Sequence, residues 1–418
     1  MGSNLVEKIF AKKLGKLVVT GEIVYLEPDL VMTHDHQGPM TIKEFENIGA
    51  KKIWNPDKVV MVMDHRTPSQ NLVAAENHQK LRGFARKYGI EKFFDVGEGV
   101  CHDLVAEKAF VKPGMVYIGT DSHTVTEGAL GVFATGVGSS EMASILATGK
   151  VWLKIPEVIK VTLTGSLQKG VMGKDIALYL LKLIKTGGAD YQVLEFSGPG
   201  IASVDIASRM SLCNMCLEMG AKSALFPVDE VTIEYYKNKG VQVESLYPDE
   251  DARYVREITI DLDRLEPLIA FPFSPDNGRT VNEIDKDYPL NQSVIGTCTG
   301  ARYEDLKVAA QILEGRRIHP QTRMLIVPAT REIMLKAVQE GLVEIFLKAG
   351  AMVNVPACGP CGGYGMGVVA EDESTITTGS RNFIARMGAP GAYIYLSNAA
   401  TAAASAIEGK LTDPRKYL

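Results

Sequence analysis

The sequence lacks an apolar run of about 18 residues, so it predicts no membrane span. Its first stretch, "MGSNLVEKIFAKKLGK", has the pattern of an amphipathic helix and lacks the apolar centre of a signal peptide. Basic charge is not in excess either, because the formal net charge is -5 and no cluster of Lys and Arg stands out. These absences favour a cytoplasmic protein that binds neither a membrane nor nucleic acid.

Cysteine is also scarce. Six cysteines in 418 residues are too few for a disulfide scaffold. Without a secretion signal, we expect a reducing compartment, where a Cys-x-x-Cys pair indicates metal binding or catalysis before a structural disulfide.

Short apolar runs rich in Val, Ile and Met alternate with segments of helical period along the whole chain. Such runs predict the buried strands of largely parallel sheets, and therefore an α/β protein. The runs are "KVVMVMDH" (58–65), "GMVYIGTDSH" (114–123), "NQSVIGTCTG" (291–300), "TRMLIVPAT" (322–330) and "AMVNVPAC" (351–358). The stretch "AATAAASAIEG" (399–409) predicts a helix that is capped by Ser397 or Asn398 and ends at Gly409.

Two breaks in composition suggest domain boundaries. The polar, proline-bearing stretch 272–291 is the clearer break, and Pro156 marks a weaker one. The sequence therefore predicts three α/β domains, which cover residues 1–156, 157–275 and 276–418.

Several of the predicted strands end in reactive side chains. They are Asp64-His65, Asp121-Ser122-His123, Cys298 and Cys358. Ligands of open α/β sheets bind outside the carboxyl ends of the strands, so these groups are expected to face one cleft between domains.

Cys298, Cys358 and Cys361 allow three interpretations. Three soft thiolates among small residues suit an iron–sulfur cluster with one iron left open as a Lewis acid. A zinc site needs a fourth ligand, such as a histidine, and a thioredoxin-like couple does not need Cys298. The second Cys-x-x-Cys pair, Cys213 and Cys216, has apolar neighbours at helical spacing, which predicts core packing.

Other polar residues suit acid–base chemistry and the binding of acids. His65, His102 and His123 each lie next to or near an aspartate, and a carboxylate beside an imidazole suits proton transfer near neutral pH. Arg381 and Arg386 suit bidentate pairing with a di- or tricarboxylate, although a solvated basic loop has the same pattern.

Over almost its whole length the chain resembles the aconitase superfamily, and most of all the large subunits of the 3-isopropylmalate dehydratase and homoaconitase type. The matching stretches include "VMTHD", "GEGVCHD", "GTDSHT", "LCNMCLEMGAK", "IGTCTGARYEDL", "VPACGPCGGYGMGVVAEDE", "SRNFIARMG" and "YLSNAATAAASAIEGKLTDP". The resemblance implies three aconitase-type domains around a central cleft, without the swivelling fourth domain.

The resemblance also implies roles for single residues. Cys298, Cys358 and Cys361 match the three ligands of a 4Fe–4S cluster with one labile iron. The residues that match catalytic positions are Asp64, His65, His102, Asp121, His123 and Glu218. The residues that match substrate-side positions are His34, Ser122, Asn214, Arg381 and Arg386. Asn214 and Glu218 are four residues apart, so one helix face is expected to present both.

The activity implied is that of a hydro-lyase, which dehydrates and rehydrates a substituted malate such as 3-isopropylmalate. The serine base of the family lies on the swivelling domain, so the resemblance implies a separate small subunit as partner, in a heterodimer or heterotetramer. Three departures leave the substrate open: "CTGAR" at 298–302, Ser380 with Ala385, and "THDHQGP" at 33–39. The alternatives are a homoaconitase, a dehydratase of 2-methylmalate or 2,3-dimethylmalate, and a non-catalytic cluster- or RNA-binding relative.

Overall fold

The apolar runs of the N-terminal part form a five-stranded parallel sheet in the computed structural model, which describes residues 2–418. Its strands, in spatial order, are β4 (Lys92–Phe94), β3 (Val59–Val62), β2 (Leu30–His34), β5 (Val116–Gly119) and β6 (Phe133–Gly136). The helices of this part are α1 (Leu5–Leu14), α2 (Gly38–Asn47), α3 (Leu72–Tyr88), α4 (Cys101–Glu107) and α5 (Ser139–Thr148). The strands β1 (Ile23–Leu26) and β7 (Val151–Lys154) form a separate antiparallel sheet of two strands.

The middle part of the chain forms a second parallel sheet of four strands. In spatial order they are β10 (Ser223–Leu225), β9 (Val193–Ser197), β8 (Val158–Thr164) and β11 (Arg256–Asp261). The helices are α6 (Gly173–Ile184), α7 (Ile206–Cys216) and α8 (Glu230–Lys237).

The C-terminal part forms a seven-stranded sheet. In spatial order its strands are β13 (Gly278–Thr280), β12 (Leu268–Ala270), β18 (Tyr393–Leu396), β17 (Ser374–Thr377), β14 (Gln292–Ile295), β15 (Arg323–Ile326) and β16 (Met352–Val353). Its helices are α9 (Tyr303–Leu313), α10 (Arg331–Gln339), α11 (Leu342–Ala349) and α12 (Ala399–Glu408). The predicted cap of α12 is confirmed, because the Asn398 side chain accepts a hydrogen bond from the Thr401 amide and Gly409 ends the helix at φ 70°.

The three sheets agree with the α/β class, and each of the five predicted apolar runs contains one of their strands. The division into three domains stays a prediction. The sheets would place its second boundary before Leu268 and not at residue 275, because β12 pairs with β18. No helix in residues 2–418 is both long and apolar enough to cross a membrane.

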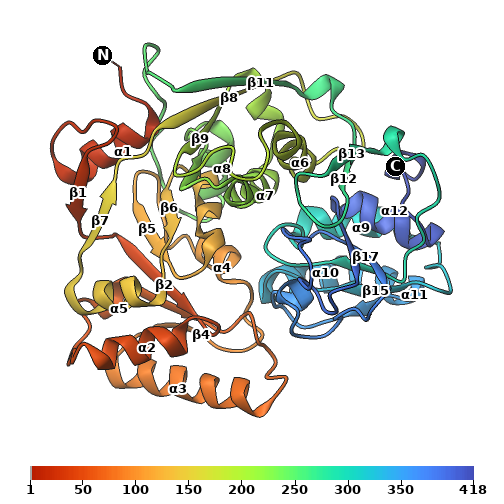
Figure 1. The fold of residues 1–418 in the computed structure, drawn as a ribbon, viewed down its shortest axis with the longest axis horizontal. Helices are drawn as coiled ribbons and strands as arrows, with labels where there is room; N and C mark the ends of the chain where they lie inside the picture. The colour runs from red at the N-terminus through yellow and green to blue at the C-terminus, as the bar shows by residue number, and fades with distance from the viewer. Residues whose placement is uncertain (1) are drawn as a thin grey trace.

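Loops that follow strands of the N-terminal sheet and strands of the C-terminal sheet line the same cavity. The N-terminal part, red to orange in Figure 1, lies beside the blue C-terminal part, and the green middle part lies across the top of the view. Short 3₁₀ helices carry several of the connecting loops: η1 (Pro56–Lys58), η2 (Ser122–Leu130), η3 (Pro199–Ser203), η4 (Leu217–Met219), η5 (Leu262–Arg264), η6 (Val281–Glu283), η7 (Gly359–Gly362) and η8 (Pro414–Lys416). Helix α7 packs against η2 and so joins the middle part to the N-terminal sheet.

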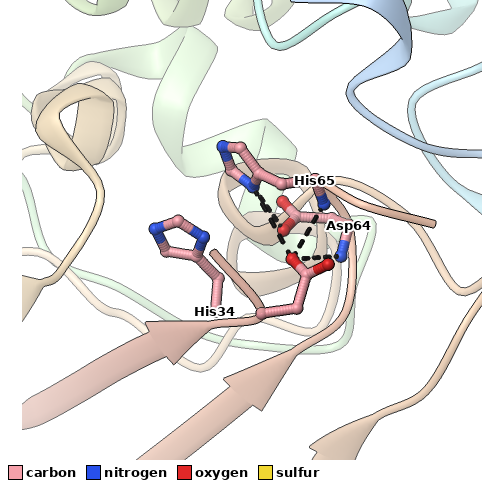
Figure 2. Close-up of side chains that lie close together, drawn as sticks. His34, Asp64 and His65 are labelled. Carbon is pink, nitrogen blue, oxygen red and sulfur yellow. Dashed lines mark hydrogen bonds and ion pairs between the residues drawn. The ribbon is translucent and has the colours of Figure 1, made fainter. Parts of the chain in front are cut away.

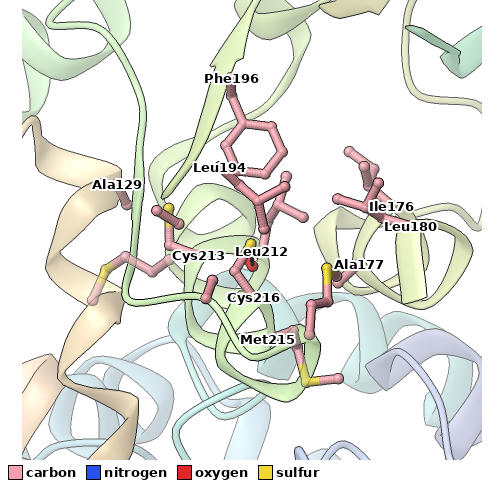
Figure 3. Packing of buried hydrophobic residues seen from close by; sticks show 14 of the residues in the cluster. Ala129, Ile176, Ala177, Leu180, Leu194, Phe196, Leu212, Cys213, Met215 and Cys216 are labelled. Carbon is pink, nitrogen blue, oxygen red and sulfur yellow. Dashed lines mark hydrogen bonds between the residues drawn. The ribbon is translucent and has the colours of Figure 1, made fainter. Parts of the chain in front are cut away.

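The second Cys-x-x-Cys pair lies in this joint. Cys213 and Cys216 are buried on α7 among Leu212, Leu194 and Phe196, as Figure 3 shows. The prediction that these two cysteines are packing residues is confirmed, because both belong to a continuous apolar core.

Helix α7 is also held by a buried ion pair. Arg209 is completely buried, and its guanidinium donates to both carboxylate oxygens of Asp229, at 2.7 and 2.6 Å. The same guanidinium donates to the backbone oxygens of Val204 and Ile201, so no polar group of this pair is left without a partner within the described chain.

Removing one member of this pair should therefore be costly. We expect Asp229→Ala to lower the free energy of unfolding by about 3–5 kcal/mol, because it leaves the Arg209 charge buried and unpaired. Urea unfolding followed by circular dichroism measures this loss. As a control, Glu344→Ala removes a partner of Lys348 from an exposed pair, and it should leave the unfolding midpoint unchanged. An equal response of the two variants would contradict the prediction.

Candidate active site

The three cysteines of the sequence prediction line one cavity of about 200 Å³. Cys298 follows strand β14, Cys358 follows β16, and Cys361 lies in η7. All three are buried, and no cysteine in residues 2–418 forms a disulfide. Burial raises the pKa of Cys298, and it raises the pKa of Cys358 to about 12. Both thiols therefore need nearby positive charge, or a metal, to act as thiolates.

Positive groups do lie beside these sulfurs. The Arg386 Nη2 atom donates to Cys361 Sγ at 3.4 Å, and the His65 Nε2 atom lies 4.0 Å from Cys358 Sγ. Three soft sulfur donors with cationic neighbours form a set that suits an iron–sulfur cluster.

The structure favours this interpretation over a zinc site. A closed zinc site would need His65 as fourth ligand, but both ring nitrogens already face carboxylates. His65 Nδ1 lies 2.7 Å from Asp64 Oδ1, and His65 Nε2 lies 3.1 Å from Asp121 Oδ2. A thioredoxin-like couple is also disfavoured, because Cys358 and Cys361 lie in a loop and a four-residue 3₁₀ helix, not at the start of an α-helix.

Four polar side chains, of which two line the cavity, are close enough to surround a cation: His34, Asp35, Asp64 and His65. Figure 2 shows that the Asp64 carboxylate is turned toward the ring of His65. Asp35 accepts from the amides of His65 and Arg66, at 2.9 and 2.7 Å, and Asp64 accepts from the Cys101 amide at 2.8 Å. Since these oxygens are used in hydrogen bonds, the group serves to orient His65.

Asp121 is the centre of the acid–base groups. Its Oδ2 atom lies 3.1 Å from His65 Nε2 and 3.6 Å from His34 Nε2. Its Oδ1 atom lies 3.2 Å from His102 Nε2 and accepts from the His123 amide at 2.7 Å. One carboxylate at the end of β5 therefore contacts histidines from four different segments.

Hydrogen bonds and neighbouring charges in this network set the protonation states of Asp121 and His65. Although burial works against its charge, hydrogen bonds from His102, His123 and His65 hold the pKa of Asp121 well below its usual range. Burial lowers the pKa of His65, but Asp64, Cys358 and Asp121 outweigh burial and raise that pKa well above the usual value. His65 is therefore an imidazolium at neutral pH, which is the form that donates a proton.

The pKa values of His102 and His34 are shifted in opposite directions. Burial would lower the pKa of His102, but Asp121 and Glu127 raise it to about 10. Burial and the neighbouring charge of His65 lower the pKa of His34 to about 4. His34 is thus neutral at pH 7, and neither of its nitrogens has a hydrogen-bond partner within residues 2–418.

A second chain of contacts joins the middle part to the cavity. Glu218 Oε1 lies 2.8 Å from His123 Nε2 and accepts from Arg381 Nε at 2.7 Å. Arg381 also approaches Ser122 Oγ at 3.4 Å. Burial opposes the charge of Glu218, but His123 and Arg381 lower its pKa, so it remains a carboxylate that positions both.

Asn214 and Glu218 both contact η2, the first from α7 and the second from the adjoining 3₁₀ turn η4. Helix α7 ends at Cys216, and Glu218 belongs to the 3₁₀ turn η4. Asn214 Nδ2 donates to Thr126 Oγ1 at 2.8 Å, while its Oδ1 atom is buried without a partner in the described chain. The tighter turn after Cys216 redirects Glu218 toward His123 and Arg381.

Eleven predicted residues line the cavity: His34, His65, His102, Asp121, Ser122, His123, Cys298, Cys358, Cys361, Arg381 and Arg386. Asp64, Asn214 and Glu218 do not line it. Asp64 and Glu218 contact residues that do, whereas Asn214 Nδ2 donates to Thr126.

Sequence reasoning missed several residues. His36, Gln37, Thr120, Gly362 and Tyr364 also line the cavity. Behind it, His78 Nε2 contacts Asp35 Oδ2 at 3.1 Å, and Glu127 Oε1 lies 3.7 Å from His102 Nδ1. The segment "THDHQGP" was a signal for His36 and Gln37, because both closely follow the end of β2.

Of the three departures from the family pattern, one lies in the loop of Cys298, one flanks Arg381, and residues 33–39 lie at the end of β2. A side chain at Gly300 would meet Thr378 at 2.3 Å, so no larger residue fits there. The Ser380 hydroxyl is buried without a partner in residues 2–418, and Ala385 has a left-handed backbone at φ 61°. None of the three removes a sulfur, a histidine or an arginine from the cavity.

Comparison with known proteins gives a consistent result. The sequence profile described as the aconitase family (aconitate hydratase) matches residues 7–409. The chain is 46% identical over 419 residues to "3-isopropylmalate dehydratase large subunit 1" of Methanopyrus kandleri, and the match covers 100% of both chains. It is 45% identical over 418 residues to the "3-isopropylmalate dehydratase large subunit" of a Thermoanaerobacter species, again over 100% of both.

A solved structure resembles the fold. The crystal structure of Thermococcus kodakaraensis aconitase X in its holo-form aligns with a TM-score of 0.53 at 13% identity, and the alignment covers 86% of this chain and 84% of that one. At this identity the likeness shows the fold alone.

The protonation of His102 leads to a test by pH. Its folded-state pKa of about 10 lies above the usual value, so its contribution to stability is complete below about pH 6.5 and is lost as pH rises through about 10. In this window, the free energy of unfolding of the parent should fall relative to that of His102→Gln by up to about 1.4 kcal/mol per pH unit. Urea unfolding at stepped pH measures the difference. Parallel pH profiles of the two proteins would contradict the assignment.

Proposed function

This chain belongs to the aconitase family, and we propose that it is the large subunit of a cluster-dependent hydro-lyase. The proposed reaction is the interconversion of 3-isopropylmalate and 2-isopropylmalate through an unsaturated acid. The observation that carries the proposal is one cavity lined at once by three cysteines, five histidines and two arginines.

The proposed cofactor is a 4Fe–4S cluster held by Cys298, Cys358 and Cys361. The fit is supported by the donor set of three sulfurs and by the Arg386 guanidinium and His65 imidazolium beside them. When bound, a cluster with three protein ligands supplies an open iron that acts as a Lewis acid toward the hydroxyl and carboxylate of the substrate. Such a site performs dehydration and not electron transfer.

The residues of the chain supply the proton and the orientation. His65, charged and oriented by Asp64, protonates the departing hydroxyl, which is otherwise a poor leaving group. Asp121 keeps His65 and His102 in place. Arg381 and Arg386 face the same cavity and bind substrate carboxylates as bidentate partners.

We propose a separate small subunit as partner. The relatives named above are called large subunits, and none of the residues in 2–418 that line the cavity is Leu, Ile or Val. An aliphatic substituent such as an isopropyl group therefore needs apolar contacts from another chain. The same partner would bring the base that removes the carbon-bound proton.

Because no Leu, Ile or Val of the described chain lines the cavity, the cavity does not distinguish 3-isopropylmalate from related malates. A homoaconitase or a dehydratase of 2-methylmalate or 2,3-dimethylmalate would use the same cysteines, histidines and arginines. A panel of these malates, assayed with the small subunit, separates the candidates by their kcat/KM values. A non-catalytic RNA-binding relative is disfavoured by the net charge of -5 and by the complete acid–base set.

Reconstitution tests the proposal. The chain is incubated with iron and sulfide without oxygen, and iron per chain and visible absorption are measured beside Cys298→Ser. We expect about four irons in the parent and a failure of the variant to retain the cluster. Cys216→Ala is the matched control, because it changes a buried cysteine of the other Cys-x-x-Cys pair and should assemble the cluster like the parent.

Two results would overturn the proposal. One is equal iron content in Cys298→Ser and the parent. The other is a parent that holds its cluster and binds the small subunit but dehydrates none of the malates.

A further inference from the structure

A lysine of the middle part is buried behind the cysteine loops. Lys174 lies near the start of α6 and is 2% exposed. Its Nζ atom donates to the backbone oxygens of Gly379 and Thr378, at 2.6 and 3.1 Å, and to Thr299 Oγ1 at 3.2 Å. Thr299 directly follows Cys298, and Gly379 lies two residues before Arg381, so the ammonium contacts both loops that shape the cavity.

This ammonium has no carboxylate partner. No Asp or Glu oxygen in the described chain forms an ion pair with Lys174. Its neighbour Asp175 is turned away, since that carboxylate accepts from the amides of Leu268 and Met172 and from the Asn398 side chain. A buried charge without an opposite charge is costly, so its presence needs a reason.

Two cavity cysteines and two buried carboxylates influence the pKa of Lys174. Burial lowers the pKa of Lys174 to about 8, and the opposing influences come from Cys298, Cys361 and Glu218. Lys174 is therefore protonated at neutral pH, and negative charge on Cys298 and Cys361 favours the protonated form.

Two of the three cysteines each have a cationic side chain as a neighbour. Cys361 contacts the Arg386 guanidinium at 3.4 Å, and Cys358 lies 4.0 Å from the His65 imidazolium. Cys298 lacks such a neighbour on the cavity side. The Arg302 guanidinium donates to the Cys298 backbone oxygen at 2.9 Å, but it is paired with Asp103 at 2.7 Å. The nearby cation without such an ion pair is Lys174, which reaches the loop of Cys298 through Thr299.

We propose that Lys174 is a positioning residue that supplies the third counter-charge of the cluster site, on the Cys298 side. The inference rests on the proposed function, because three thiolates outweigh the positive charge of a cubane core. A fixed ammonium in a dry surrounding stabilises the anionic assembly and favours its reduced form over the oxidised form.

A structural clamp is the competing explanation. The hydrogen bonds of Lys174 join α6 to two loops of the C-terminal part, and they would do so without a cluster. The clamp needs the donors of the side chain, whereas the counter-charge needs its positive charge.

Two variants separate these explanations. Lys174→Gln keeps hydrogen-bond donors and loses the charge, and Lys174→Met loses both. Lys182→Met is the matched control, because it removes a lysine from the exposed side of the same helix, where it pairs with Glu283. The three variants and the parent are reconstituted together, and four properties are measured: urea stability of the metal-free chain, iron content, rate of cluster loss to a chelator, and midpoint potential by spectroelectrochemistry.

We expect both Lys174 variants to lose the cluster about 10- to 100-fold faster than the parent and to show a lower midpoint potential. Their metal-free stability should equal or exceed that of the parent, and Lys182→Met should resemble the parent throughout. Cluster retention and potential of the parent in Lys174→Gln would overturn the inference, as would a loss of stability in both metal-free variants. A parent that binds no cluster would instead refute the proposed function.

Discussion

The site depends on one buried carboxylate, that of Asp121. Its two oxygens lie within 3.6 Å of nitrogens from His34, His65, His102 and His123. Because Asp121 follows β5 and the histidines follow other strands or begin neighbouring helices, parallel strands must end at one edge for this set to form. The arrangement of the N-terminal sheet is therefore also what sets the protonation of the cavity.

Charge balance links this network to the cysteines. Burial disfavours thiolates at Cys298 and Cys358, and the cationic groups His65, Arg386 and Lys174 are placed around the three sulfurs. His65 takes part in both networks, since Asp64 and Asp121 keep it charged and its Nε2 atom also lies 4.0 Å from Cys358 Sγ. Under the proposed function, the same imidazolium connects proton transfer with metal binding.

The sequence allowed much of this to be predicted, for identifiable reasons. Apolar runs that end in Asp, His or Cys can be recognised in a parallel sheet, and the strands β3, β5, β14, β15 and β16 lie within the predicted runs. Asp35, Glu127 and Lys174 could not be found this way, because their contacts join residues that lie far apart in the chain, and no local pattern records them. The change from α-helix to 3₁₀ turn after Cys216, before Glu218, has no clear sequence mark.

Anomalous diffraction at the iron edge, from crystals of the reconstituted chain grown without oxygen, tests the central claim most directly. The account predicts iron density in the cavity that contacts the sulfurs of Cys298, Cys358 and Cys361, with no fourth ligand from a side chain of this chain. A single metal ion bound by the sulfurs together with a histidine would contradict it, as would iron located elsewhere in the protein.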